Sequence, residues 1–187
     1  MTQSSRFGND RATCGVAADR GVERDELLVP VRRLRDSGAQ VVHAAPEKEA
    51  VRTVLHDTEQ AIAVDPDASL DSVAVEDYAA LVIPGGTVNA DKLRLTEPAV
   101  EVVRSFAAAG KTIAAICHGP WLLVEADLIR GRSLTSYPSL RTDIRNAGGE
   151  WTDEPMVRSA NGWTLITSRN PGDLDDFTGA ILTDLGG

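Results

Sequence analysis

Short runs of apolar residues alternate along this chain with segments in which apolar residues recur at helical spacing. The apolar runs predict buried strands at residues 11–18, 40–45, 78–83 and 111–116. The helical spacing predicts helices at residues 23–37, 97–109 and 173–185. Because strands alternate with helices, the pattern predicts an α/β fold with a mostly parallel central sheet.

The ends of these helices carry residues that usually cap them. Gly38 and Gly110 follow two of the helices and are expected to end them. Thr96 and Asp173 precede two helices and are expected to cap their first turns. The capping residues therefore support the helix boundaries that the periodicity predicts.

The remaining segments give weaker patterns. Residues 47–77 are largely polar and are predicted to hold a small β excursion, with strands at 60–64 and 70–75. A short strand at 133–136 and a helix at 138–146 precede two strands, 156–159 and 164–168, which flank an Asn161-Gly162 turn. Residues 1–10 are predicted to be a flexible tail, and residues 11–187 a single domain.

Cys117 lies between the strand predicted at 111–116 and a short apolar helix that Pro120 is well placed to begin. A strand that turns directly into a helix, with a cysteine at the turn, is the geometry of a nucleophile elbow. Such a helix points free N–H groups at the turn and would lower the pKa of the thiol. His118 follows, and Gly119 permits the sharp bend that would bring the two side chains together. The alternative is that Cys117 is a small buried hydrophobic residue.

Composition and charge exclude several classes of function. The net charge of −9 disfavours nucleic acid and anionic membranes as partners. No apolar stretch is long enough to span a bilayer, and the polar N-terminus lacks the apolar core of a signal peptide, so a cytoplasmic location is expected. Two cysteines do not make a disulfide framework, and Cys14 is expected to serve packing in the first strand. Metal-ligand spacings, Walker loops and dinucleotide fingerprints are absent from the sequence, so neither a metal nor a cofactor is expected.

Histidine is scarce, and its positions restrict the choice of a catalytic base. The three histidines are His43, His56 and His118, and none follows position 118. A glutamine amidotransferase or a cysteine variant of an α/β-hydrolase would need a histidine late in the chain, so both are excluded. The base must be His118 or an acidic group, and His43 and His56 are expected to be structural or surface residues.

Several other positions have two interpretations from the residues alone. Gly85 and Gly86 follow a strand, where their N–H groups would form either an oxyanion hole or an ordinary turn. Glu26 suits the positive end of a helix dipole, and it would also reach Cys117 and tune its pKa if both lie at the same sheet edge. Asp91 is expected in a loop, as a solvated acid.

The stretch Ala114-Ala-Ile-Cys-His-Gly-Pro-Trp-Leu-Leu123 resembles the signature of the PfpI family of intracellular cysteine peptidase-like proteins, which is related to the parkinsonism-associated deglycase. The resemblance covers most of the chain from about residue 11. It extends through Leu81-Val-Ile-Pro-Gly-Gly86, Leu134-Thr-Ser-Tyr-Pro138, Ile144-Arg-Asn-Ala-Gly148 and Thr167-Ser-Arg-Asn-Pro-Gly-Asp173. It implies a flavodoxin-like three-layer sandwich, the general stress protein-like branch of the family, and a homodimer or higher homo-oligomer.

The resemblance also implies roles for individual residues. Cys117 matches the family nucleophile, and His118 matches its neighbour in the triad. Glu26 matches the glutamate that hydrogen-bonds the nucleophile. Asp91 matches an acidic residue that a neighbouring subunit contributes in peptidase-like members, which would complete the site only in the oligomer.

Two further matches concern the substrate pocket, and together the matches favour an enzyme. Gly86, with Gly85 beside it, matches an oxyanion-hole donor, and Tyr137 matches a residue that lines the pocket. The favoured substrates are reactive carbonyls such as methylglyoxal, or their early adducts on proteins. One alternative is an intracellular cysteine peptidase, and the other is a non-enzymatic stress-response redox sensor or chaperone with an oxidisable cysteine.

Overall fold

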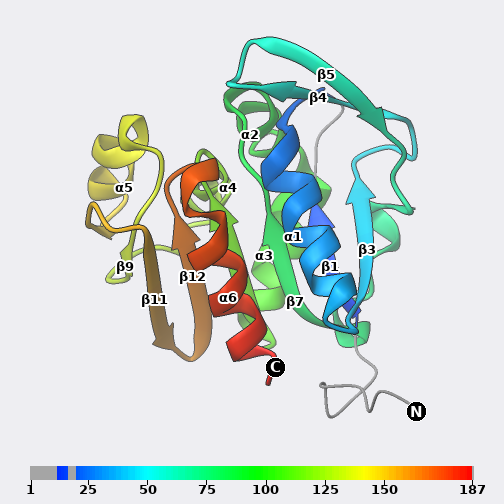
Figure 1. The fold of residues 1–187 in the computed structure, drawn as a ribbon. Helices are drawn as coiled ribbons and strands as arrows, with labels where there is room; N and C mark the ends of the chain where they lie inside the picture. The colour runs from blue at the N-terminus through cyan, green and yellow to red at the C-terminus, as the bar shows by residue number, and fades with distance from the viewer. Residues whose placement is uncertain (1–11, 17–19, 187) are drawn as a thin grey trace.

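The centre of the fold is a seven-stranded sheet in the order β11-β12-β8-β7-β1-β3-β6 (Figure 1). The computed structural model describes residues 12–16 and 20–186. The strands of the sheet are β1 (Ala12–Val16), β3 (Gln40–Ala45), β6 (Ala68–Ser69), β7 (Tyr78–Ile83), β8 (Thr112–Ile116), β11 (Met156–Asn161) and β12 (Trp163–Ser168). Every neighbouring pair is parallel except β11 and β12, which form the predicted hairpin. The prediction of a mostly parallel sheet is confirmed.

Helices cover both faces of this sheet. α1 (Arg24–Asp36) and α6 (Leu174–Asp184) pack together on one face, which is in front in Figure 1. α3 (Glu97–Ala108) and α4 (Pro120–Glu125) pack together on the other face. The chain therefore forms the predicted three-layer sandwich.

Strand β8 shows why the sheet is covered on both sides. Its residues Ile113 and Ala115 belong to the core beneath α3, whereas Ala114 and Ile116 belong to the core beneath α1 and α6. Side chains alternate between the two faces of a strand, so a strand that is apolar throughout must be buried on both faces. The carboxyl ends of the parallel strands form one edge of the sheet, and Cys117 lies at this edge, directly after β8.

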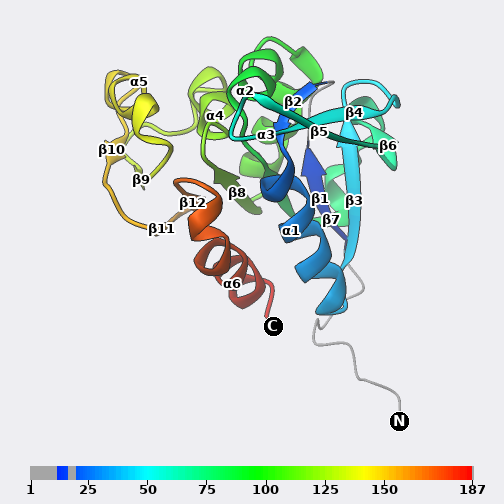
Figure 2. The same cartoon turned by 45° about the horizontal axis from the view of Figure 1, so that its top comes forward.

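A second sheet of three strands lies at the end of the molecule toward which β3 points (Figure 1). It consists of β2 (Arg20–Glu23), β4 (Val51–Leu55) and β5 (Glu59–Val64). Strands β4 and β5 form an antiparallel hairpin, and the turned view shows them in front of α2 (Thr87–Leu93) (Figure 2). The predicted β excursion in residues 47–77 is confirmed, although β2 lies where a turn was expected.

The strand predicted at residues 70–75 is wrong. The chain forms two short 3₁₀ helices there, η1 (Leu70–Ser72) and η2 (Val75–Asp77). Ser69 donates a hydrogen bond to the Asp71 carboxylate (2.5 Å), and Ser72 donates one to the Ser69 carbonyl (2.6 Å). Such local side-chain bonds offer the backbone an alternative to a strand ladder.

Thr96 and Asp173 occupy the predicted N-cap positions of α3 and α6, but neither side chain makes a capping hydrogen bond; the predicted glycine stops are confirmed. The Thr96 hydroxyl donates to the Lys92 carbonyl (3.0 Å) instead of capping α3. The Asp173 carboxylate accepts from the Arg169 guanidinium (2.9 and 3.0 Å) instead of capping α6. Each side chain therefore bonds to a residue that precedes its helix and not to the free amides of the first turn.

The remaining elements are short. They are β9 (Ser133–Leu134), η3 (Pro138–Leu140), α5 (Arg141–Asn146), β10 (Glu150–Trp151) and η4 (Pro171–Asp173). Strands β9 and β10 pair with each other in a separate small sheet. The predicted tail at residues 1–10 and the predicted packing of the Cys14 side chain lie outside what the structure describes. Across the described part of the chain, every helix is too short or too polar to cross a bilayer.

His43, in β3, gives the fold a stability that depends on pH. Its side chain is 4% exposed, and burial lowers the pKa of its imidazole even though the Asp67 carboxylate lies nearby. The folded pKa lies below the unfolded value of about 6.5, so this contribution is complete above that pH and is lost as the pH falls below it. When the pH is lowered from about 7.5 to about 5.5, we expect the unfolding free energy of His43→Leu to fall by less than that of the parent. Urea denaturation measures this, and equal losses in both proteins would contradict it.

Candidate active site

Cys117 lies directly after β8 and three residues before α4 begins, in a strained backbone conformation. Its φ is +60°, in the left-handed region that residues other than glycine rarely adopt. Its N–H donates to the Ser168 carbonyl (3.0 Å), and its own carbonyl accepts from the Tyr137 N–H (2.9 Å). The predicted bend from strand to helix is present, but it occurs at Cys117 and not at Gly119, whose φ is −49°.

Glycines allow the segments around Cys117 to approach closely. A Cβ atom on Gly119 would lie 2.7 Å from the Ile83 carbonyl oxygen. A Cβ atom on Gly85 would lie 2.6 Å from the Glu26 carboxylate and 2.7 Å from the Cys117 Cβ atom. Neither position has room for a side chain, so β7, β8 and α1 meet tightly around the thiol.

His118 lies beside the thiol, as predicted. Its Nδ1 atom is 3.2 Å from the Cys117 sulfur, and its ring stacks on Tyr137 with centroids 4.7 Å apart. Its Nε2 atom is 3.2 Å from the hydroxyls of both Thr87 and Ser139, two contacts that the sequence did not predict. Burial lowers the pKa of the imidazole, so its neutral form is favoured and can accept a proton from the thiol.

Glu26, in the first turn of α1, lies on another side of the thiol. The carboxyl is fully buried, and its Oε2 atom accepts from the Gly85 N–H (2.8 Å). Burial, with a smaller contribution from the charge of Glu23, raises the pKa of Glu26 to about 8. At neutral pH this side chain is therefore mainly a carboxylic acid, and its Oε1 atom is buried without a hydrogen-bond partner among the described residues.

The pKa of Cys117 itself is raised, which corrects the prediction that the helix would lower it. The thiol is only 5% exposed, and burial is the largest cause, followed by the charge of Glu26; a hydrogen bond from the Gly86 backbone acts in the opposite direction. Any field from the start of α4 is therefore outweighed by burial, and the Trp121 N–H at the start of the helix is already bonded to the His118 carbonyl (3.0 Å). The resting thiol therefore keeps its proton until a base accepts it.

The two glycines after β7 have different roles. The Gly86 N–H lies at the sulfur, where it can also stabilise charge on a reacting group. The Gly85 N–H is already bonded to Glu26 and so is not free for an oxyanion hole, whereas the role of Gly86 in such a hole stays a prediction. Tyr137 is 39% exposed and covers His118, in agreement with a position at the pocket wall.

Asp91 does not join these residues within the described chain. It is an exposed residue of α2, not of a loop as predicted, and it makes no hydrogen bond or ion pair inside the part of the chain that the structure describes.

A different acid, Asp57, lies near the site at the tip of the β4–β5 hairpin. Its Oδ1 atom accepts from the Thr87 N–H (2.7 Å), and its charge raises the pKa of His118 against the lowering caused by burial. The sequence did not indicate Asp57, because His56-Asp57 is not a typical hairpin turn pair.

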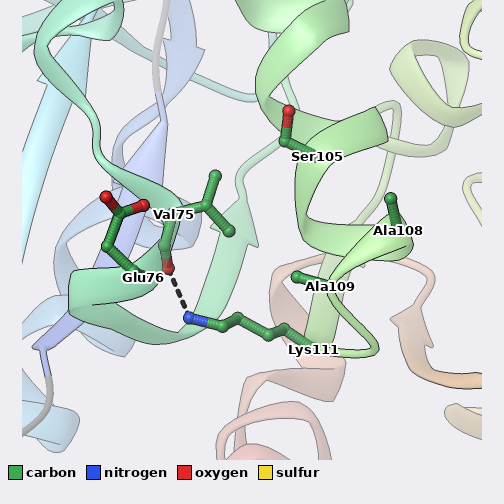
Figure 3. A pocket seen from close by; sticks show the side chains of 6 residues that line it. All are labelled: Val75, Glu76, Ser105, Ala108, Ala109 and Lys111. Atoms are coloured by element: carbon green, nitrogen blue, oxygen red, sulfur yellow. Dashed lines mark hydrogen bonds between the residues drawn. The ribbon is translucent and has the colours of Figure 1, made fainter.

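A separate hollow of about 570 Å³ lies at the other end of β8 (Figure 3). Its lining residues are Val75, Glu76, Ser105, Ala108, Ala109 and Lys111. The Lys111 ammonium donates to the carbonyls of Val75 and Tyr78, so it ties η2 and the start of β7 to the start of β8. This arrangement is structural and lies at the opposite end of the strand from Cys117. Over the described residues, no group of three or more His, Cys, Asp and Glu side chains is placed to hold a metal ion.

Comparison with known proteins identifies the family of this chain. The sequence profile of the DJ-1/PfpI family matches residues 13–184. The chain belongs to the DJ-1/PfpI family. This family member is 41% identical to a protein named Deglycase PfpI from Pyrococcus furiosus, over 80% of this chain and 84% of the relative. It is 39% identical to Protein/nucleic acid deglycase 2 from Escherichia coli, over 88% of this chain and 92% of the relative. The crystal structure of Drosophila melanogaster DJ-1beta matches it with a TM-score of 0.84 at 30% identity, over 96% of this chain and 92% of that one.

Proposed function

We propose that this DJ-1/PfpI family member is a hydrolase that uses the Cys117 thiol to remove small reactive carbonyls, such as methylglyoxal, or their early adducts on proteins. One observation carries the proposal: two groups able to transfer protons flank a single thiol. His118 Nδ1 lies 3.2 Å from the sulfur, and the Glu26 carboxyl, with a pKa of about 8, packs beside Cys117 around Gly85. Groups that titrate near the working pH are efficient general acids and bases. The names of the two deglycase relatives support the same reaction class.

The first step is addition of the thiol to the aldehyde. The Cys117 sulfur bonds to the aldehyde carbon, and the thiol proton passes to His118 Nδ1. The aldehyde oxygen takes a proton from Glu26 and becomes the hydroxyl of a hemithioacetal. Gly86 N–H, which lies at the sulfur, stabilises negative charge as the bond forms.

The next steps convert this adduct into a hydroxy acid without any redox partner. The Glu26 carboxylate removes the proton from the carbon that bears sulfur, while His118 protonates the neighbouring ketone oxygen. Glu26 returns a proton to that neighbouring carbon, and the hydroxyl on the carbon that bears sulfur gives its proton to His118, which yields a lactoyl thioester. Water then cleaves the thioester to lactic acid and the free thiol, so the net change is methylglyoxal plus water to lactate and a proton.

The burial of the site favours this function over its two alternatives. A thiol that is 5% exposed beneath Tyr137 suits a small aldehyde better than an extended peptide. The peptidase alternative also requires a homo-oligomer in which Asp91 reaches the site of a neighbouring subunit. The redox-sensor alternative requires a thiolate, whereas burial raises the pKa of Cys117 and so opposes oxidation.

The test is lactate formation from methylglyoxal by the parent and by Cys117→Ser. We expect the serine variant to lose roughly 10³-fold or more of the turnover, because a hydroxyl is a much weaker nucleophile than a thiol. The matched control is Cys14→Ser, which removes the other cysteine and should keep the turnover of the parent. Equal lactate formation by Cys117→Ser and the parent would contradict the proposal.

A further inference from the structure

We propose that Asp57, from the β4–β5 hairpin of the same chain, is the acidic positioning residue for His118 and acts through Thr87. This inference rests on the proposed function, since it assigns a partner to the proposed base. In this proposal the acidic residue that acts on His118 comes from the same chain, whereas the family resemblance assigns the acidic residue of the site to Asp91 of a neighbouring subunit.

The hairpin tip that carries Asp57 is held in an unusual conformation. His56 and Asp57 have φ values of +51° and +63°, and Thr58 N–H donates to the Leu55 carbonyl (3.2 Å). Two left-handed residues at the centre of a four-residue turn make a type I′ turn, in which glycine, asparagine and aspartate are the usual residues. Asp57 fits this preference but the turn contains no glycine, so contacts from another part of the structure add to its stability.

Glu23 provides this stabilisation. Its side chain lies at the junction of β2 and α1 and is only 5% exposed. One carboxylate oxygen accepts from the His56 N–H (3.2 Å), and the other accepts from the Asp57 N–H (3.2 Å). A buried carboxylate that uses both oxygens on one turn fixes the position of that turn, because leaving it unpaired would be costly.

From this position Asp57 connects to His118 in two hydrogen bonds. Its Oδ1 atom accepts from the Thr87 N–H (2.7 Å) at the start of α2. The Thr87 hydroxyl is 3.2 Å from His118 Nε2. Gly86, whose N–H lies at the Cys117 sulfur, immediately precedes Thr87, so the same contact also anchors that donor.

Asp57 acts when His118 takes the thiol proton. The proton moves from the Cys117 sulfur to Nδ1, which leaves a positively charged ring whose Nε2–H donates to a hydroxyl. The titratable groups around this ring are Cys117, Glu26, the Tyr137 phenol and Asp57, with Glu23 behind Asp57. In the resting site Glu26 is mainly neutral, so the negative charge already present near His118 before the reaction starts is that of the Asp57 carboxylate.

The first test is an NMR titration of the histidine ring protons in a Cys117→Ser background, with and without Asp57→Asn. Asparagine tolerates a left-handed φ and keeps an oxygen for the Thr87 N–H, so the change removes the charge and spares the turn. We expect the pKa of His118 to fall in the Asp57→Asn protein. Only three histidines need assignment. The matched control is Glu59→Gln, an exposed change in the same hairpin, which should leave the titration unmoved.

The second test uses turnover with Cys117 present. We expect Asp57→Asn to lower kcat roughly tenfold with little change in KM, which is less than the loss of a direct general base. Thr87→Val should lower kcat similarly. In the Thr87→Val background, Asp57→Asn should cause almost no further loss of kcat, because both changes interrupt the same connection between Asp57 and His118. Thermal unfolding of each variant separates this effect from loss of fold.

The outcomes distinguish this inference from the function on which it rests. An unchanged His118 titration and unchanged kcat in Asp57→Asn would overturn the inference, as would a tenfold loss in Asp91→Asn without any loss in Asp57→Asn. If Cys117→Ser keeps its turnover, the proposed function fails, but the NMR titration still decides whether Asp57 acts on His118.

Discussion

Replacing Glu26 with glutamine should lower turnover by roughly 10²–10⁴-fold while it makes the protein more stable in alkaline solution. Glutamine can accept from the Gly85 N–H through its oxygen, as the acid does, and it has nearly the same shape. It cannot give up or take a proton, so the two steps that need Glu26 as acid and as base are both lost. The hydrogen bonds of the resting site remain.

The gain in stability follows from the direction of the pKa shift. The folded pKa of Glu26, about 8, lies above its ordinary value of 4.5. The folded protein holds this proton more tightly than the unfolded chain, so the contribution is complete below the unfolded pKa and is lost as the pH rises through 8. Glutamine carries no such penalty, so at about pH 9 the variant should be more stable than the parent by on the order of 4 kcal/mol.

Denaturant unfolding at about pH 5 and about pH 9 measures this difference, and lactate formation measures the turnover. The matched control is Glu101→Gln, an exposed change on α3 that should alter neither quantity. A variant that keeps turnover within tenfold of the parent would remove Glu26 from the proton transfers. A variant that gains no alkaline stability would show that the folded protein does not hold the Glu26 proton.

Replacing Gly86 with alanine should destabilise the protein by more than about 3 kcal/mol and abolish turnover. Gly86 has a φ of +89°, and a Cβ atom there would lie 2.0 Å from the Gly21 carbonyl oxygen and 2.8 Å from the Glu23 nitrogen. Both neighbours are backbone atoms of β2, which cannot move without disturbing the three-stranded sheet. The N–H that lies at the Cys117 sulfur would shift with the turn.

Thermal and urea unfolding test this prediction, and Gly179→Ala is the matched control. Gly179 lies in the middle of α6, where an added Cβ atom would have no neighbour within 4 Å. Alanine is the better helix former, so this control should raise the unfolding free energy by about 0.5–1 kcal/mol. Equal stability of Gly86→Ala and the parent would mean that the close contact between Gly86 and β2 is not maintained in solution.

The sequence predicted the layers of the fold and the position of the thiol because these depend on patterns within one segment. Strand β8 is apolar at every position, which specifies burial on both faces. The carboxyl ends of parallel strands share one edge of a sheet, and for this reason Glu26 and Gly86 could be placed near Cys117 without coordinates. The likeness of the segment around Cys117 to a family signature added the identity of His118 as its partner.

The sequence did not predict features that depend on contacts between distant segments. The raised pKa of Cys117 arises from burial by β7, α1 and β12, which no local pattern reports. Helix α2 is short and contains Asn89 and Asp91, which are weak helix formers, so the local sequence predicts a loop at Asp91. The turn at Asp57 depends on Glu23, a residue 34 positions earlier in the chain.

The proposed reaction therefore depends on one thiol that adds to a carbonyl and on two groups, His118 and Glu26, that transfer protons. The direct measurement is acid quenching of the parent protein during methylglyoxal turnover, followed by mass spectrometry of its peptides. We predict a mass increase of one methylglyoxal molecule on the peptide that contains Cys117, and a loss of this species when turnover is complete. Turnover with no such species on Cys117, or with the adduct on Cys14 instead, would contradict the account.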